Sequence, residues 1–256
     1  MISPLASIHP DARIGENVEI GPFTTISADV EIGEGTWIGP NVTIMDGARI
    51  GACCRVFPGA VLSAIPQDLK FQGENTTVEI GDRSTIRECV TINRGTKAYG
   101  KTVVGQDCLI MAYVHIAHDC IIGNHVILVN SVALAGHVEI GDYGIVSGLS
   151  AVHQFVKIGA HVMIGGGAMV RKDVPPFITA AGEPLAYAGV NSVGLKRRDF
   201  SQEDINEIQT LYRTLYQSGM NVSQAVNRIK EQYPNRPLAD LILSFIEQSD
   251  RGLIRK

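Results

Sequence analysis

The sequence has few aromatic residues and no long uninterrupted run of apolar residues. Phe, Trp and Tyr make up 6% of the 256 residues, and Trp occurs once. No apolar run approaches the roughly 20 residues that a membrane-spanning helix needs, and the N-terminus lacks the apolar segment of a signal peptide. We therefore expect a protein without a transmembrane segment, located in the cytoplasm.

Cysteine and net charge are also limited. The five cysteines form no Cys-x-x-Cys pair and no regular framework, which argues against a structural zinc site held by thiolates and favours a reducing compartment. The formal net charge of −4 argues against a general nucleic-acid-binding protein. The chain is long enough for a stable core in one or two domains.

What the sequence does contain is a repeat of six residues. Of the 29 positions from 2 to 170 in steps of six, 26 are Ile, Leu or Val, and the exceptions are Asp68, Glu74 and Ala98. Neither an α-helix nor an ordinary strand has this period, so the pattern indicates a repeat architecture. Hexapeptide repeats are typical of a parallel β-helix, and we predict that each aliphatic residue of the series points into its core.

Glycine follows the aliphatic residue at eleven of these positions, as at Gly15, Gly33 and Gly51. Because Gly and Asn tolerate positive φ, we expect the tight corners of the coil here. The pattern resembles that of hexapeptide-repeat transferases, which implies a left-handed coil of three hexads, or 18 residues. Successive coils are then expected to stack about 4.8 Å apart.

The register ends at Val170, and the composition changes after it. Residues 173–190 are rich in Pro, Ala and Gly and are interpreted as a connection. Apolar spacing predicts three helices, the first from Ser201 to Gly219 with a capping box, the others near 222–232 and 237–249. Such helices would cover the open end of the solenoid.

The chain is thus divided into a β-helix over residues 1–190 and a C-terminal helical domain over residues 191–256. Two interruptions of the β-helix are expected near 63–77 and 93–103. Counting in steps of 18 places both on one face, with a column formed by Leu62, Ile80, Ala98, Ile116, Leu134 and Val152. Long loops in compact folds are often functional.

Four histidines lie beside the same column, within three coils and about 10 Å along the axis. They are His115, His118, His137 and His153. Two kinds of chemistry fit them, general base catalysis and metal binding. Asp119 follows His118 and precedes His137 by 18 positions, so it could orient an imidazole, which favours base catalysis. His125 and His161 belong to another face, where we expect them to stack on each other.

Longer segments resemble one family specifically, the acyl-carrier-protein-dependent UDP-N-acetylglucosamine O-acyltransferases of lipid A biosynthesis. The resemblance covers nearly the whole chain. The segments that carry it are Gln67-Asp68-Leu69-Lys70, Thr91-Ile92-Asn93-Arg94-Gly95-Thr96, His115-Ile116-Ala117-His118-Asp119-Cys120, Leu134-Ala135-Gly136-His137, Ala151-Val152-His153-Gln154-Phe155, Ile158-Gly159-Ala160-His161-Val162-Met163, Asp173-Val174-Pro175-Pro176, Gly194-Leu195-Lys196-Arg197-Arg198 and Arg251-Gly252-Leu253-Ile254.

The resemblance implies a homotrimer of left-handed β-helices with active sites in clefts between subunits. It implies transfer of an (R)-3-hydroxyacyl group to the 3-hydroxyl of UDP-N-acetylglucosamine. The donor would be acyl carrier protein, which holds the acyl group on phosphopantetheine. No further cofactor, no metal and no acyl-enzyme is expected.

By the same resemblance, His118 is the general base, Asp119 supports it, and the Gly136 N–H donates to the oxyanion. Gly166 marks the end of the acyl groove and predicts a long acyl chain. Lys196 and Arg198 are candidates for a basic rim that meets the acidic carrier protein. Substrate contacts are expected from Asp68, Lys70, His115, His137, His153, Gln154, Asn191 and Arg197.

The chain departs from the family pattern at Asn93, where relatives often have His, and at Val193, where they often have Glu. Three other hypotheses are weighed against this one. The sister N-acyltransferase would carry an extra domain before the repeat, which here begins at Ile2. A hexapeptide-repeat carbonic anhydrase would use an interfacial zinc site and no carrier-protein loop. A purely structural solenoid would not need four histidines beside two interruptions.

Overall fold

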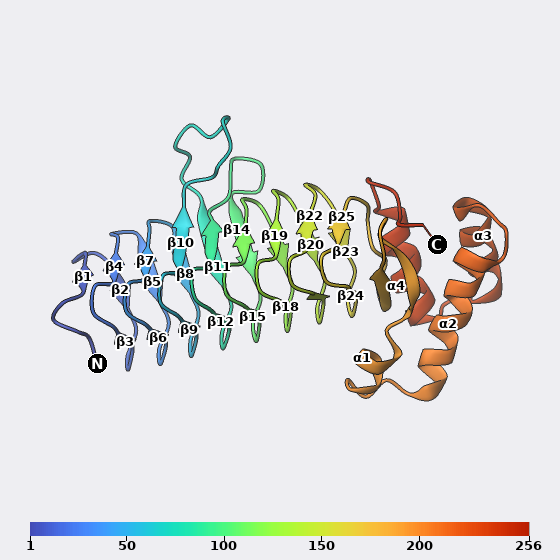
Figure 1. Cartoon of the computed structure of the whole chain (residues 1–256), viewed down its shortest axis with the longest axis horizontal. Helices are drawn as coiled ribbons and strands as arrows, with labels where there is room; N and C mark the ends of the chain where they lie inside the picture. The colour runs from blue at the N-terminus through green and yellow to red at the C-terminus, as the bar shows by residue number, and fades with distance from the viewer. Residues whose placement is uncertain (256) are drawn as a thin grey trace.

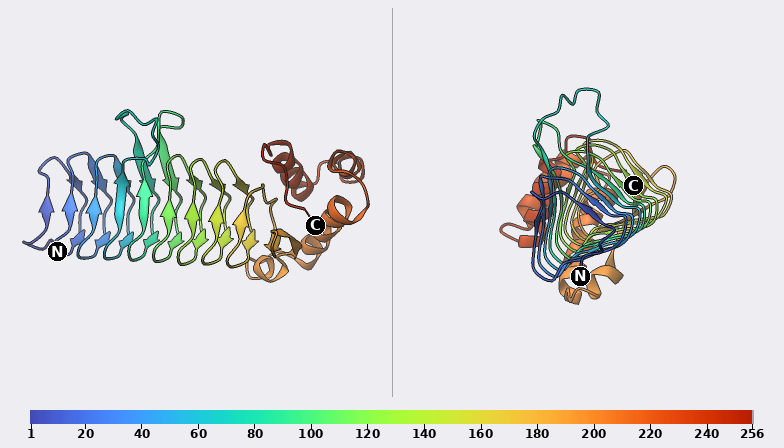
Figure 2. Two further views of the ribbon diagram at one scale, coloured as in Figure 1. Left: turned by 45° about the horizontal axis from the view of Figure 1, so that its top comes forward. Right: turned by 90° about the vertical axis from the view of Figure 1, so that its left-hand side faces the viewer.

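The computed structural model describes residues 1–255 and shows a long solenoid followed by a group of helices (Figure 1). The solenoid is a left-handed parallel β-helix built almost entirely from strands of two to four residues. Seen from its end it is triangular, with one sheet on each side (Figure 2). The predicted fold class is confirmed.

Each sheet takes one strand from every coil. Sheet 1 consists of β1 (Ser7–Ile8), β4 (Thr25–Ile26), β7 (Thr43–Ile44), β10 (Val61–Ala64), β13 (Thr91–Asn93), β16 (His115–Ile116), β19 (Ala133–Leu134), β22 (Ala151–Val152) and β25 (Met169–Val170). Sheet 2 consists of β2 (Arg13–Ile14), β5 (Val30–Ile32), β8 (Ala48–Ile50), β11 (Thr77–Ile80), β14 (Lys101–Val104), β17 (Ile121–Ile122), β20 (Glu139–Ile140) and β23 (Lys157–Ile158). Sheet 3 consists of β3 (Glu19–Ile20), β6 (Trp37–Ile38), β9 (Arg55–Val56), β12 (Thr85–Ile86), β15 (Leu109–Ile110), β18 (Ile127–Leu128), β21 (Ile145–Val146), β24 (Met163–Ile164), β26 (Ile178–Ala181) and β27 (Ala186–Val190).

The repeated aliphatic residues form the core, as predicted. From Ile20 to Val170 every Ile, Leu and Val of the six-residue series is buried. Ile2 is exposed, and Ile8 and Ile14 are only half-buried, because few coils cover them at the open end. Fully burying such a side chain contributes roughly 1.5–3 kcal/mol, so the stacked ladder is the main source of stability.

The predicted column through Ile80 and Ala98 is wrong. Leu62 pairs with Ile92, which in turn pairs with Ile116, whereas Ile80 belongs to sheet 2. The first separation is 30 positions and the second is 24, which exceed one coil of 18 by 12 and by 6. Both interruptions therefore add a multiple of six, so the six-residue register survives them while the 18-residue register does not.

The glycines that follow the aliphatic residues serve a different purpose from the one predicted. Gly33 has no positive φ, and a Cβ there would lie 2.5 Å from the carbonyl carbon of Gly51 in the next coil. Glycine is required because stacked coils approach closely at this position. The left-handed backbone falls two residues later, as at Asn17, where φ is 56°.

The segment after the repeat is more regular than a simple connection. β26 extends sheet 3, and β27 pairs with it antiparallel. The helices are α1 (Ser192–Lys196), α2 (Gln202–Gln217), α3 (Val222–Gln232) and α4 (Pro237–Glu247). The three predicted helices are confirmed, including the capping box of Ser201 and Asp204, while α1 was not predicted. Within residues 1–255 no helix has the length and apolarity to cross a bilayer.

Candidate active site

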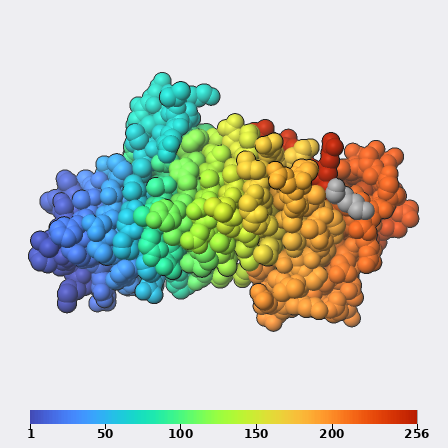
Figure 3. Space-filling model, in the orientation of Figure 1, coloured from blue at the N-terminus to red at the C-terminus, as the bar shows by residue number. Residues whose placement is uncertain are grey.

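Both interruptions leave the solenoid at one corner, between sheets 1 and 2. The first loop joins β10 to β11 and the second joins β13 to β14, and both project from the same edge (Figures 1 and 3). In the following coils the same corner carries His118 and Asp119, and then Gly136 and His137. The prediction that the two interruptions share a face with the histidines is thus confirmed for His118 and His137.

Asp119 is the buried centre of this corner. Its Oδ2 atom lies 2.8 Å from Nδ1 of His118. Thr96, from the second interruption, donates its N–H to Oδ1 at 2.9 Å and its hydroxyl to Oδ2 at 2.7 Å. Burial alone would raise the pKa of Asp119, but the hydrogen bonds from Thr96 and His118 outweigh it and hold that pKa below its usual value. Asp119 is therefore a fixed anion beside His118.

His137 packs over this pair. Its ring lies edge-on to His118 with the centroids 5.1 Å apart, and its Nε2 is 3.7 Å from Oδ2 of Asp119. Phe155 stacks on it from the next coil at 4.4 Å, and Tyr99 of the second loop packs at 5.6 Å. Burial lowers the pKa of His137, so it favours the neutral form.

Gly136 provides space for the His118 ring. A Cβ at this position would lie 2.6 Å from Cε1 and 2.7 Å from Nε2 of His118. The Gly136 N–H donates to no other group in residues 1–255. An unpaired N–H beside the imidazole Nε2 is suited to stabilising negative charge that develops on a reacting oxygen.

The other two histidines of the group are less closely placed. His115 lies on β16, with Nδ1 2.7 Å from the hydroxyl of Thr91 one coil below, and burial lowers its pKa. His153 is exposed, with Nδ1 3.2 Å from the carbonyl oxygen of Gln154. Neither forms a hydrogen bond with His118 or Asp119.

The first loop brings Asp68 toward the site. Its charge acts on His137, where it favours the protonated form and opposes the effect of burial. Its carboxylate also accepts the N–H of Lys70 at 2.9 Å, and the Lys70 side chain is exposed. Asn93, which departs from the family pattern, is buried and donates to the Ile65 carbonyl at 3.0 Å, so it fixes the base of this loop.

Asn191 and Arg197 lie elsewhere in the single chain. Asn191 caps α1 by accepting the N–H of Gly194 at 3.1 Å, and its amide donates to the His161 carbonyl at 2.9 Å. Arg197 is exposed at the end of α1. Figure 1 shows α1 at the edge opposite the two loops, so one chain does not bring these residues to His118.

The predicted stacking of His125 on His161 needs a correction. Tyr143 stands between them, with ring centroids 4.6 Å from His125 and 4.9 Å from His161. Burial lowers the pKa of His161 to about 4. Arg198 lies over Tyr143 at 5.1 Å and donates to its carbonyl at 3.2 Å, so this guanidinium is partly buried in the stack rather than free on a rim.

Gly166 occupies the corner between sheets 3 and 1, one coil beyond Gly148. A Cβ there would be 3.5 Å from the Gly148 carbonyl oxygen, which is ordinary contact. Gly166 and His118 therefore lie at opposite edges of sheet 1. The shorter way from one to the other crosses the outer face of that sheet.

The site residues are suited to base catalysis and, by type, to holding a metal ion. Single ligand atoms of His118, Asp119 and His137 lie within 4.8 Å of one another. The neighbouring thiol of Cys120 is buried and donates to the Ala135 carbonyl at 3.2 Å, and burial raises its pKa to about 12. Cys120 is therefore a packed core residue and not an activated nucleophile.

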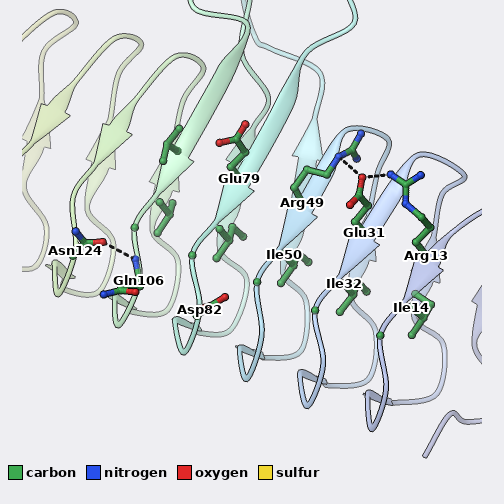
Figure 4. Close-up of a pocket in the computed structure, with 18 residues that line it drawn as sticks. Arg13, Ile14, Glu31, Ile32, Arg49, Ile50, Glu79, Asp82, Gln106 and Asn124 are labelled. Carbon is green, nitrogen blue, oxygen red and sulfur yellow. Dashed lines mark hydrogen bonds and ion pairs between the residues drawn. The ribbon is translucent and has the colours of Figure 1, made fainter.

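A hollow runs along the outer face of sheet 2, away from this corner (Figure 4). It is lined by alternating charges that pair with one another, with Nε of Arg49 3.0 Å from Glu31, which also binds Arg13. It contains no histidine and no cysteine among its lining residues. Its carboxylates Glu31 and Glu79 are held in ion pairs with Arg49 and Lys101, so the hollow lacks the imidazole–carboxylate pair found at the other corner.

Comparisons with known proteins decide the family. Domain 2 of the UDP-N-acetylglucosamine O-acyltransferases matches residues 173–254, and bacterial transferase hexapeptide repeats match residues 29–64 and 101–136. An acyl-[acyl-carrier-protein]--UDP-N-acetylglucosamine O-acyltransferase from Janthinobacterium is 50% identical, over 100% of this chain and 99% of its own. The chain belongs to the UDP-N-acetylglucosamine O-acyltransferase family.

Solved structures agree with this membership. A UDP-N-acetylglucosamine acyltransferase from Bacteroides fragilis superposes with a TM-score of 0.98 at 52% identity, covering 100% of both chains. One from Francisella novicida superposes with a TM-score of 0.96 at 42% identity, covering 100% of this chain and 94% of that one. The chain is thus an acyltransferase of the O-acyltransferase family, which overturns the carbonic anhydrase, N-acyltransferase and purely structural hypotheses.

Proposed function

We propose that the protein transfers an (R)-3-hydroxyacyl group from acyl carrier protein to the 3-hydroxyl of UDP-N-acetylglucosamine, the first step of lipid A biosynthesis. The observation that supports this most strongly is the His118–Asp119 pair. A buried carboxylate holds Nδ1 of the imidazole at 2.8 Å, which leaves Nε2 as the free basic atom.

In this mechanism Nε2 of His118 takes the proton of the sugar hydroxyl as its oxygen attacks the thioester carbonyl. Asp119 accepts the Nδ1–H and stabilises the imidazolium that forms. The Gly136 N–H donates to the carbonyl oxygen as it becomes negative, a contribution of about 3 kcal/mol. Collapse breaks the carbon–sulfur bond, and His118 returns its proton to the departing thiolate.

The acyl group passes directly from the thioester to the hydroxyl, without an acyl-enzyme. Cys120 is buried and has a raised pKa, so no activated thiol lies beside the His118–Asp119 pair. This supports the direct route. The proposal requires no cofactor other than the phosphopantetheine that the donor carries.

A homotrimer explains the separation of the predicted binding residues. Asn191 lies beside His161 at the corner between sheets 2 and 3, whereas His118 lies between sheets 1 and 2, so a neighbouring subunit would bring Asn191 and Arg197 to the sugar nucleotide. The exposed Arg197 guanidinium is suited to a diphosphate because it can donate two parallel hydrogen bonds. The remaining contacts would come from His115, His137, His153, Gln154, Asp68 and Lys70.

The acyl chain would cross sheet 1 from His118 toward Gly166. The first residues of β19 and β22 on this face are Ala133 and Ala151, which are small. The missing side chain at Gly166 leaves the far edge open, so the donor should carry a long acyl chain.

An acyl-transfer assay tests the function. Carrier-bound 3-hydroxyacyl chains of several lengths are incubated with UDP-N-acetylglucosamine, and both the product and the intact protein are weighed by mass spectrometry. We expect a monoacylated sugar nucleotide and no acylated protein. A covalent acyl-protein that forms and decays at the turnover rate would refute the direct route, and absence of product with every donor would refute the function.

A further inference from the structure

Four exposed basic residues gather where the last coil meets the C-terminal tail. Arg171 and Lys172 follow β25, and Arg251 and Arg255 lie on the tail. We call these four residues the basic cluster. Three of them, Arg171, Lys172 and Arg255, line a pocket of about 630 Å³ whose other walls include Met169.

Buried Asp173 holds the two halves of the cluster together. Its carboxylate accepts the Ser249 hydroxyl at 2.6 Å and the Arg251 N–H at 3.2 Å. Its backbone pairs with the tail at Leu253, and Arg255 pairs with Ala186. The backbone of the tail is therefore fixed beside Arg171 and Lys172, so the fold itself brings the four basic residues together.

None of the four cations forms an ion pair among the residues that the structure describes. This contrasts with sheet 2, where Arg49 and Arg13 are neutralised by Glu31 (Figure 4). Glu183 is the one acid that lines the pocket. In a chain with a net charge of −4, the cluster is thus a local concentration of unpaired positive charge.

The cluster is continuous with the candidate active site. The Arg251 guanidinium lies 5.6 Å from the centroid of the Phe155 ring, and Phe155 stacks on His137 at 4.4 Å. His137 in turn contacts His118. Arg171 and Lys172 lie one coil beyond Phe155 and three coils beyond the His118–Asp119 pair. The cations therefore follow the same corner, roughly 14 Å along the axis from that pair.

We propose that the basic cluster is the docking surface for the acidic carrier protein that delivers the acyl thioester. The proposal rests on the proposed function, and it assigns docking to Arg171, Lys172, Arg251 and Arg255 instead of Lys196 and Arg198. A carrier protein bound here would place its phosphopantetheine beside the corner that carries the His118–Asp119 pair. Charge complementarity at such a surface raises the association rate and selects the partner, and it weakens as salt increases.

The test compares two donors with the same acyl group, one on carrier protein and one on uncharged pantetheine. The variants are Arg171→Glu, Lys172→Glu and the double reversal. Arg228→Glu, on α3, is an exposed control with the same change in charge as either single reversal. For the double reversal we expect a KM for the carrier-bound donor at least tenfold higher and a kcat within twofold, with the difference shrinking in high salt. The pantetheine donor and the Arg228 control should keep their normal KM.

An unchanged KM for the carrier-bound donor in the double reversal would overturn the proposal. A KM that rises equally for both donors would also overturn it, because the cluster would then contact the arm or the acyl chain. Titration of the unacylated carrier protein gives a readout that is independent of turnover, with at least tenfold weaker binding expected for the double reversal. Normal transfer with unchanged carrier binding refutes docking alone, whereas absence of transfer by the natural sequence refutes the proposed function.

Discussion

Replacing Thr96 by Val tests how the second loop acts on the His118–Asp119 pair. The change removes the 2.7 Å hydrogen bond from the hydroxyl to Oδ2 of Asp119 and keeps the backbone bond to Oδ1. A hydrogen bond to a charged group contributes about 1.5–3 kcal/mol. If it serves to hold the carboxylate against His118, kcat should fall by about ten- to one-hundredfold, since 1.4 kcal/mol corresponds to a factor of ten.

Thr96→Val should also change the pH dependence of activity in one direction. The Thr96 hydroxyl is one of the groups that hold the pKa of Asp119 low, so its removal raises that pKa toward the usual value. The carboxylate then becomes protonated at a higher pH as the solution is acidified. The acid limb of kcat/KM should shift upward, and the stability that Asp119 contributes above its unfolded pKa should be lost at a higher pH than in the natural sequence.

The controls separate positioning from folding. Thr96→Ser keeps the hydroxyl and should restore most of the activity and the acid limb. Thr76→Val is the matched control, because Thr76 is also buried but its hydroxyl has no hydrogen-bond partner among residues 1–255. The reasoning is refuted if Thr96→Val has a normal kcat and pH profile. It is also refuted if Thr76→Val lowers kcat as much as Thr96→Val does while the two variants have the same melting temperature.

Three further predictions concern other parts of the chain. Gly136→Ala places a Cβ within 2.7 Å of the His118 ring, so kcat should fall at least tenfold with little change in melting temperature; normal turnover would contradict the assigned geometry. Gly166→Met has room at its Cβ and should fold, but mass spectrometry of the products should show shorter acyl chains. An unchanged chain length would argue against an acyl groove that ends at Gly166. His161 has a pKa lowered by burial from 6.5 to about 4, so its neutral form stabilises the fold above pH 6.5, and urea unfolding at pH 5 should show a loss of about 2 kcal/mol relative to pH 7.5. His161→Phe should lose that part of the acid sensitivity.

The sequence predicts the fold well because one local rule is repeated along the chain. An inward Ile, Leu or Val of one coil is buried by the same kind of residue in the next coil. The spacing alone therefore predicts the core from Ile20 to Val170. Helices α2, α3 and α4 were predictable because caps and apolar spacing are local signals. The short α1 and the β26–β27 pair were not, since tertiary pairing decides them.

The site was predicted in part, for a reason that lies in the interruptions. Counting by 18 succeeds from Ile116 onward, so the grouping of His118, Asp119 and His137 was accessible from spacing. It fails across insertions of 12 and 6 positions, so the count could not bring Thr96 to Asp119 or Tyr99 to His137. Nor does spacing within one chain reveal residues that only a neighbouring subunit would supply.

The central claim is that His118 is the base of an acyl transfer at this corner. The most direct measurement is kcat/KM of purified His118→Ala with carrier-bound 3-hydroxyacyl donor and UDP-N-acetylglucosamine, beside the natural protein at equal folded concentration. We expect a loss of at least one-hundredfold, because positioned general bases contribute about 10²–10⁴. Oligomeric state and melting temperature should be unchanged. Activity within a few-fold of the natural protein would contradict the account.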